Sequence, residues 1–368
     1  LAQALMLLCR SGAEIGTAQN VGRSDKRTAY HFCNASLWAG TFFAVVLTAV
    51  FVVFSRPLIG FFHIEDAAVV ESARLYLMAV SFGLIFQFVA ITFTGMFNGS
   101  GNSRVPFFIN CIGLGTNIVL DPVMIFVFDL GVLGAAYATV FAQFLVALAY
   151  VVYIAKGNSI FKDFRPSLKI RWEYMRQTFV WGIPIALESA IFTAIAMFIS
   201  RIVASYGAVP IAAQKIGTQI ESMSWMISQG FAAATASFVG QNYGAGKFSR
   251  INRGYRTALY LVCGWGAVTT AILFLFPEFL FRLFLKEPEA VAVGVSYLKI
   301  LSASQLLMCV DITTAGAFRG LGKTALPSAV TIVFTALRIP MAMVLTRFWG
   351  LDGVWWAITI SSNIKGIL

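Results

Sequence analysis

The sequence predicts an all-α polytopic membrane protein that contains two pseudo-symmetric six-helix lobes. Of its 368 residues, 59% are hydrophobic and only 12% are charged, whereas about 25% of the residues in a soluble domain are charged. Long apolar stretches recur along the chain, and most have the ~20 residues that a membrane-spanning helix needs. The phrase TGMFNGSGNSRVP at 94–106 also returns as AGAFRGLGKTALP at 315–327. These observations together predict two tandem copies of one helical unit within a membrane.

The expected helices follow one another along the whole chain. A partial helix at 1–21 comes first, and the apolar stretches after it are continuous rather than alternating, which favours helices over membrane strands. Because the stretches recur throughout, they are interpreted as spans and not as a signal peptide. The ten expected spans cover residues 37–54, 75–97, 105–128, 132–154, 179–203, 222–239, 258–276, 291–318, 326–345 and 351–360.

The repeat sets the orientation of the two lobes. The duplicated phrase is shifted by 221 residues, and QNVG at 19–22 recurs as QNYG at 241–244 with a shift of 222. Six spans separate the two copies of the phrase, so both copies have the same orientation and the lobes are expected to be parallel repeats. The glycines of the phrase are expected to form tight turns after helix ends, because glycine tolerates positive φ. They are Gly99, Gly101, Gly320 and Gly322.

The predicted organisation is an N-terminal lobe at 1–155, a cytoplasmic connecting segment at 156–176 and a C-terminal lobe at 177–368. The connecting segment is the longest polar stretch of the chain. Through the repeat, Leu1 corresponds to about position 223, so the second lobe has a whole helix that lacks a counterpart in the first. We therefore expect that the first helix of the N-terminal lobe is missing from this chain, and that the natural protein has twelve spans.

The loop charges alternate along the chain. Loops at 22–31, 98–104, 155–177, 243–257 and 319–323 together hold 16 basic and three acidic residues. The intervening loops, at 55–71, 129–131, 204–210, 277–290 and 346–352, hold four basic and eight acidic residues. The first set is expected to be cytoplasmic by the positive-inside rule. The net charge of +11 is thus explained by topology, and binding to nucleic acid is not expected.

The sequence does not predict an enzyme. Its five cysteines lie in or near apolar spans without a CxxC motif, and they are interpreted as small core residues. We find no nucleophile–base set, metal cluster or nucleotide-binding loop. No cofactor is expected beyond a coupling ion.

Several phrases resemble the multidrug and toxic compound extrusion (MATE) family. Besides the duplicated phrase, they are Asp121-Pro122 within NIVLDPVMIF, GVLGAAYAT at 131–139, Gly182-Ile183-Pro184, IAAQKI at 211–216 and VGQNYGAGK at 239–247. Together they extend over nearly the whole chain. The resemblance implies two six-helix lobes around a central cavity that opens alternately to each side of the membrane. It also implies export of organic cations, driven by the entry of Na⁺ or H⁺.

Charged side chains within membrane spans are costly, so each is a candidate for function. Glu188 lies four residues after Pro184, and it is expected toward the outer part of the cavity. Asp311 lies near the middle of its span, eight residues before Arg319. A carboxylate in a low-dielectric site suits Na⁺ ligation or proton carriage, and both positions resemble the cation-linked acids of NorM-like members of the family. Glu188 and Asp311 are therefore the candidate coupling residues; the alternative is that each is paired with a buried base or bonded to hydroxyl groups.

Four further residues are candidates for coupling or substrate binding. Glu221 has either a structural or a coupling role, and Asp121 is expected to cap the helix that restarts after Pro122. Met223 and Met226, beside Glu221, are candidates to line a cavity for hydrophobic cations. Apart from Na⁺ at the coupling acids, no metal site is expected.

Arg338 occupies the position that corresponds to Asn117 in the first lobe. Two interpretations of this residue stay open. Its guanidinium group either pairs with an acid inside the second lobe or extends along the helix to the membrane interface.

The resulting hypothesis is a multi-pass antiporter of a bacterial inner membrane that functions as a monomer. It would export amphipathic organic cations as Na⁺ or H⁺ enters, by alternating access of its two lobes. The alternative is a lipid-linked saccharide flippase of related architecture, which the acidic excess among the charges within the spans disfavours. A membrane receptor or assembly subunit that transports nothing is a further alternative, disfavoured by the repeat with its buried acids.

Overall fold

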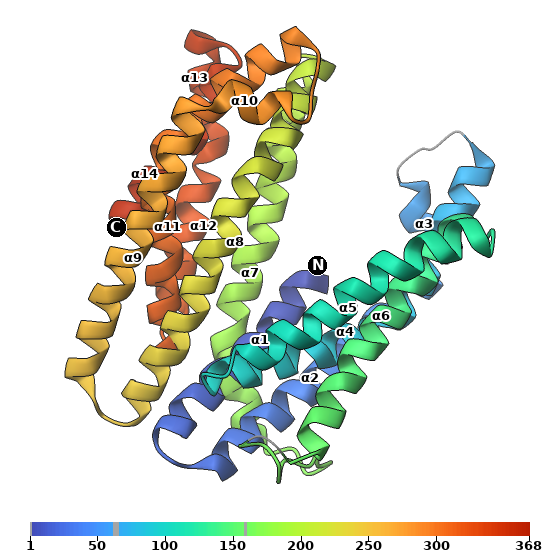
Figure 1. Ribbon diagram of the computed structural model, residues 1–368, viewed down its shortest axis with the longest axis vertical. Helices are drawn as coiled ribbons and strands as arrows, with labels where there is room; N and C mark the ends of the chain where they lie inside the picture. The colour runs from blue at the N-terminus through green and yellow to red at the C-terminus, as the bar shows by residue number, and fades with distance from the viewer. Residues whose placement is uncertain (1, 62–65, 158–159) are drawn as a thin grey trace. The chain divides into compact units, whose positions relative to one another are not determined.

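The computed structural model describes residues 2–61, 66–157 and 160–368, and the described residues form helices joined by short turns (Figure 1). The chain divides into two compact units, named unit 1 (Leu1–Gly182) and unit 2 (Ile183–Leu368). The boundary falls within a long helix, α7 (Trp172–Ala204), so each unit contains part of it.

Unit 1 is organised around its longest complete helix, α4, which contacts α1, α2 and α6. Helix α5 packs against α6 and continues after Pro122 as a short π-helix, η1. The helices are α1 (Ala2–Gly22), α2 (Lys26–Val53), α3 (Ser55–Gly60), α4 (Ala67–Gly99), α5 (Arg104–Pro122), η1 (Val123–Val127) and α6 (Gly131–Ala155).

Unit 2 repeats this arrangement around α11, which contacts α8, α9 and α14 (Figure 1). After α7, its helices are α8 (Ala208–Gly244), α9 (Phe248–Leu275), α10 (Pro277–Arg282), α11 (Pro288–Gly320), α12 (Ala325–Ala336), α13 (Arg338–Trp349) and α14 (Asp352–Ile367).

The repeat extends to the bounds of the helices. Helices α4 and α11 each have 33 residues, and both ends are related by the shift of 221. Helices α2 and α9 each have 28 residues, and their ends are related by a shift of 222. Even the six-residue helices α3 and α10 correspond. The predicted all-α fold built from two repeats is therefore confirmed.

The ten predicted spans lie almost entirely in helices, but not all of these helices have the length and hydropathy of a membrane span. Among the described residues, eight helical segments are long and apolar enough to cross a membrane. Helices α8 and α14 are not among them: α14 has only 16 residues, and α8 carries Lys215, Gln219 and Glu221 in its first half. Both nevertheless pack on the central helix of unit 2. The chain is a multi-pass membrane protein.

Part of the segment predicted as a connection packs onto unit 1. Phe161 and Phe164 are buried in the apolar core that α2, α4, α5 and α6 share. The Tyr30 hydroxyl donates to the Ile160 carbonyl at 2.8 Å, and the Asn34 amide donates to the Ser167 carbonyl at 2.8 Å. These contacts explain why unit 1 continues beyond 155. The proposed division into lobes at 1–155, 156–176 and 177–368 stays a prediction.

The glycines of the duplicated phrase have two different roles. Gly101 and Gly322 have φ of 82° and 74°, so they form the expected turns with positive φ. Gly99 and Gly320, which were also predicted to form turns, are instead the last residues of α4 and α11. Both lie where a neighbouring helix crosses closely.

This crossing has the same geometry in both units. A Cβ atom at Gly316 or Gly320 would overlap the backbone of α8 at Ala232 or Ala236. In unit 1, Gly95 and Gly99 lie in the same way against the carbonyls of Arg10 and Glu14 on α1, at the equivalent positions of the first repeat. Pairs of glycines four residues apart allow membrane helices to approach closely.

We expect Gly316→Leu to destabilise unit 2, because the new side chain would push α11 away from the α8 backbone. Overpacking of this kind costs about 1–3 kcal/mol. The thermal unfolding temperature of purified protein should fall, whereas Gly264→Leu, whose Cβ would meet nothing within 4 Å, should leave it nearly unchanged. Equal stability of the two variants would contradict the proposed role of this crossing.

Candidate functional site

Glu188 lies on α7 among the ends of two other helices of unit 2. Its Oε2 accepts a hydrogen bond from the Ser328 hydroxyl at 2.7 Å, and its Oε1 lies 3.8 Å from the Arg319 guanidinium. Arg319 is in the last turn of α11, and Ser328 is in the first turn of α12. These partners flank the basic turn at 319–323, and the expectation that Glu188 lies toward the outer part of the cavity stays a prediction.

Asp311 forms an ion pair that connects α11 to α14. Its Oδ2 lies 2.9 Å from the Lys365 ammonium, and the two side chains are only 15% and 11% exposed. Arg319 is eight residues beyond Asp311 on the same helix, or about 12 Å along its axis. The two predicted coupling acids thus occupy separate sites within unit 2, and each has a basic partner.

Arg338 donates hydrogen bonds to side chains of α14 within unit 2. Its Nε and one terminal nitrogen donate to the hydroxyls of Ser361 and Ser362, both at 2.9 Å. Its guanidinium also lies 6.0 Å from the centre of the Phe192 ring. The structure thus gives Arg338 hydroxyl partners, and both interpretations of this residue stay predictions.

Glu221 is the most deeply buried acid of this group, with 3% of its surface exposed. One carboxylate oxygen accepts a hydrogen bond from the Tyr297 hydroxyl at 2.8 Å, and the other accepts one from the Gln305 amide at 2.7 Å. Both partners lie on α11 and are themselves buried. Sequence reasoning missed them, although their spacing of eight residues places them near one face of a helix.

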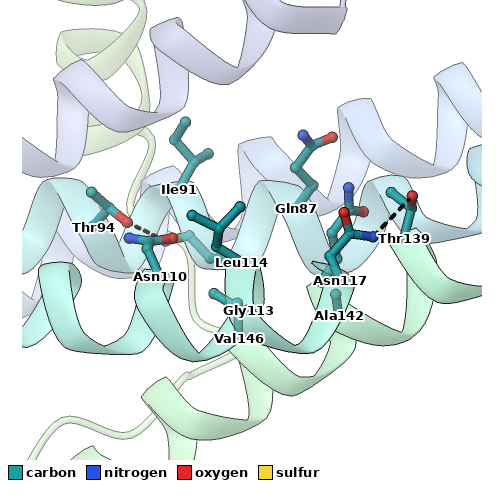
Figure 2. A pocket seen from close by; sticks show the side chains of 12 residues that line it. Gln87, Ile91, Thr94, Asn110, Gly113, Leu114, Asn117, Thr139, Ala142 and Val146 are labelled. Atoms are coloured by element: carbon teal, nitrogen blue, oxygen red, sulfur yellow. Dashed lines mark hydrogen bonds between the residues drawn. The ribbon is translucent and has the colours of Figure 1, made fainter. Parts of the chain in front are cut away.

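Unit 1 contains a cavity of about 330 Å³ between α4, α5 and α6 (Figure 2). Among the described residues that line it, none is charged. The polar side chains that line it are Gln87, Thr94, Asn110, Asn117, Thr139 and Gln143. The cavity therefore offers amide and hydroxyl groups to a ligand.

Asp121 lies one helical turn from this cavity. The Asn117 amide donates to Asp121 Oδ1 at 3.2 Å and approaches the Thr139 hydroxyl at 3.5 Å, as the dashed line in Figure 2 indicates for the second contact. Within the described residues, no side-chain bond caps the start of η1. The predicted capping role of Asp121 is therefore wrong: the helix continues through Pro122 as a π-helix, and the carboxylate binds a side chain.

Met223 and Met226 lie on the surface of unit 2. Each is 70% exposed, so neither side chain is enclosed by this unit. Their role in contact with substrate stays a prediction.

The sequence matches the MatE family model over residues 1–123 and 184–344. This chain belongs to the MatE family. The match covers helices of both units, including those that carry Glu188, Glu221, Asp311 and Arg338.

Relatives of this MatE chain include two bacterial proteins. It is 29% identical to the probable multidrug resistance protein NorM of Thermotoga maritima, over 96% of this chain and 77% of the relative. It is 26% identical to the probable multidrug resistance protein YpnP of Bacillus subtilis, over 94% of this chain and 77% of the relative. Among solved structures, MATE in complex with MaL6 matches with a TM-score of 0.91 at 24% identity, covering 100% of this chain and 83% of that one. This last similarity concerns the fold.

The described part of the MatE chain contains no group of three or more His, Cys, Asp or Glu side chains that could hold a metal ion. The four acids considered above instead occur singly, each with hydroxyl, amide or basic partners.

Proposed function

We propose that this MatE protein is a secondary active antiporter that exports amphipathic organic cations in exchange for Na⁺ or H⁺. Its relatives carry names that denote multidrug resistance. The observation that carries the coupling part of the proposal is the pair of half-buried acids, Glu188 and Asp311, on helices that are long and apolar enough to cross the membrane. Charges in such positions are costly, and they are characteristic of ion pathways.

The contacts in unit 2 suggest how a cation acts on these acids. Glu188 is held by Ser328 and loosely by Arg319, and Asp311 is held by Lys365. An incoming Na⁺ or proton competes with these partners, and Na⁺ also finds oxygen ligands in the carboxylate and nearby hydroxyls. Because the cation binds one conformation more tightly than the other, it shifts the population of the two, and alternating access follows.

Glu221 and Asp121 receive different roles. Glu221 has both oxygens bonded to buried donors, so we assign it a structural role that supports α8 and α11 in unit 2. Asp121, with Asn117, Thr139 and the cavity beside them, offers oxygens and space together. We propose this part of unit 1 as the second candidate for coupling or substrate binding.

The same proposal includes the membrane, the oligomeric state and the ligands of the protein. The relatives are bacterial, so we place the protein in a bacterial cell membrane, as a monomer whose ligands are small molecules. The flippase alternative receives no support from these relatives.

The substrate class is tested by dye export from an efflux-deficient bacterial host that expresses the protein. We expect cationic ethidium to accumulate less than in cells with an empty vector, and an anionic dye of similar size to accumulate equally in both. The functionally neutral control is Glu278→Gln, which alters an exposed ion pair with Arg282. Export of the anionic dye alone would contradict the proposed preference for cations.

A further inference from the structure

The cavity of unit 1 and the charged cluster of unit 2, which consists of Asp311, Lys365 and Arg338, occupy corresponding places in the repeat. The shift is 221 residues between α4 and α11, and 219 between α6 and α14, whose sequences align from GVLG at 131–134 to GLDG at 350–353. Ala90 on α4 and Val146 on α6 both line the cavity of unit 1. Their counterparts are Asp311 and Lys365, which form the ion pair of unit 2.

The other members of the cluster show the same correspondence. Asn117 lines the cavity together with Ala142 and Gln143. Its counterpart is Arg338, which donates to Ser361 and Ser362, the counterparts of Ala142 and Gln143. The same space between helices is therefore neutral and open in unit 1, whereas long charged side chains occupy it in unit 2.

The charges of the ion pair balance within this space. Asp311 supplies one negative charge, and Lys365 supplies one positive charge 2.9 Å away. An aspartate without a partner at this depth would be costly, and Lys365 removes that cost. Lysine is suited to the task because its ammonium group is a compact cation on a flexible stem, and its attachment to α14 gives it a high effective concentration at Asp311.

We infer that Lys365 is a tethered cation that occupies the Asp311 site, and that a transported cation reaches this carboxylate only when Lys365 leaves it. The inference rests on the proposed antiport, and it adds that the Lys365 side chain regulates access of the cation to Asp311. Unit 1 has no such lysine, because Val146 stands at the corresponding position. The two units thus differ in whether a cation must displace part of the protein.

The test removes the tethered charge and measures the state of Asp311 without transport. In purified full-chain protein, Lys365→Gln should increase Na⁺ affinity at least tenfold in equilibrium binding of radioactive sodium. If protons are the ligand, the same variant should show a new protonated carboxyl band in infrared difference spectra at a pH where the wild type shows none. Either gain should disappear when Asp311→Asn is added.

Matched variants separate the charge of Lys365 from its structural contribution. Lys365→Arg keeps a tethered cation and should show neither gain, whereas Lys365→Val copies the residue of unit 1 and should behave like Lys365→Gln. If Lys365→Gln is folded and neither sodium binding nor Asp311 protonation changes, the inference is overturned. These measurements use no gradient, so a failure of the antiport proposal, seen as wild-type export that ignores ion gradients, would be recognised separately.

Discussion

Replacing Glu188 by Gln and Asp311 by Asn together is expected to lower gradient-driven export at least ~100-fold, which corresponds to about 2.7 kcal/mol of lost coupling. The double variant keeps the size of both side chains, and Ser328 and Lys365 keep an oxygen to bind. It loses both negative charges that an incoming cation neutralises. Movement of dye down its own concentration gradient, by facilitated diffusion, should be less affected than export of dye against its concentration gradient.

The single variants and a control complete this prediction. Because Asp311 lies about 12 Å along α11 from Arg319, the basic partner of Glu188, each single variant should retain part of the coupling. Glu278→Gln, at an exposed ion pair, should transport like the wild type. If the double variant exports dye at the wild-type rate with the wild-type ion dependence, these acids are not the coupling residues and the site near Asp121 takes their place.

Glu221→Ala is expected to destabilise the protein more than any of the other substitutions proposed for α8 and α11, costing about 3–5 kcal/mol. It leaves the buried Tyr297 hydroxyl and Gln305 amide without their acceptor and opens a void between α8 and α11. Glu221→Gln keeps one carbonyl acceptor and should cost less, about 1–3 kcal/mol. Unfolding of the purified protein in detergent, followed by tryptophan fluorescence, measures both.

The matched control for this substitution lies on the same helix. Met223→Ala removes an exposed side chain two residues away, and it should change stability by less than about 0.5 kcal/mol. If Glu221→Ala were as stable as Met223→Ala while export was lost, Glu221 would have a coupling role rather than a structural one.

The sequence predicted the elements of this fold well because the length of an apolar stretch and the repetition of a phrase can be read directly from the order of the residues. The shifts of 221 and 222 related the ends of equivalent helices without an error of even one residue. The acids within spans were visible in the sequence as isolated charges. The turns at Gly101 and Gly322 were predictable for the same reason, since a positive φ favours glycine locally. The distinct role of Gly99 and Gly320 was not, because it depends on a neighbouring helix.

The partners of the acids depend on how the helices rotate about their axes and pack against one another. The length of an apolar stretch does not indicate either. Lys365 is separated from Asp311 by 54 residues, and Ser328 from Glu188 by 140. The partners of Glu188 come from the ends of two other helices, which its position four residues after Pro184 does not indicate. The bond between Asn117 and Asp121 replaced the expected cap because Pro122 does not interrupt the helix.

The proposed antiport is most directly tested with the full chain reconstituted in liposomes, by measuring ethidium movement under an imposed Na⁺ or H⁺ gradient. Antiport predicts that dye moves against its own gradient when one of these ions is supplied in the opposite direction, and that it stops when that gradient is collapsed. Dye movement that is the same with and without both gradients would contradict the antiport mechanism.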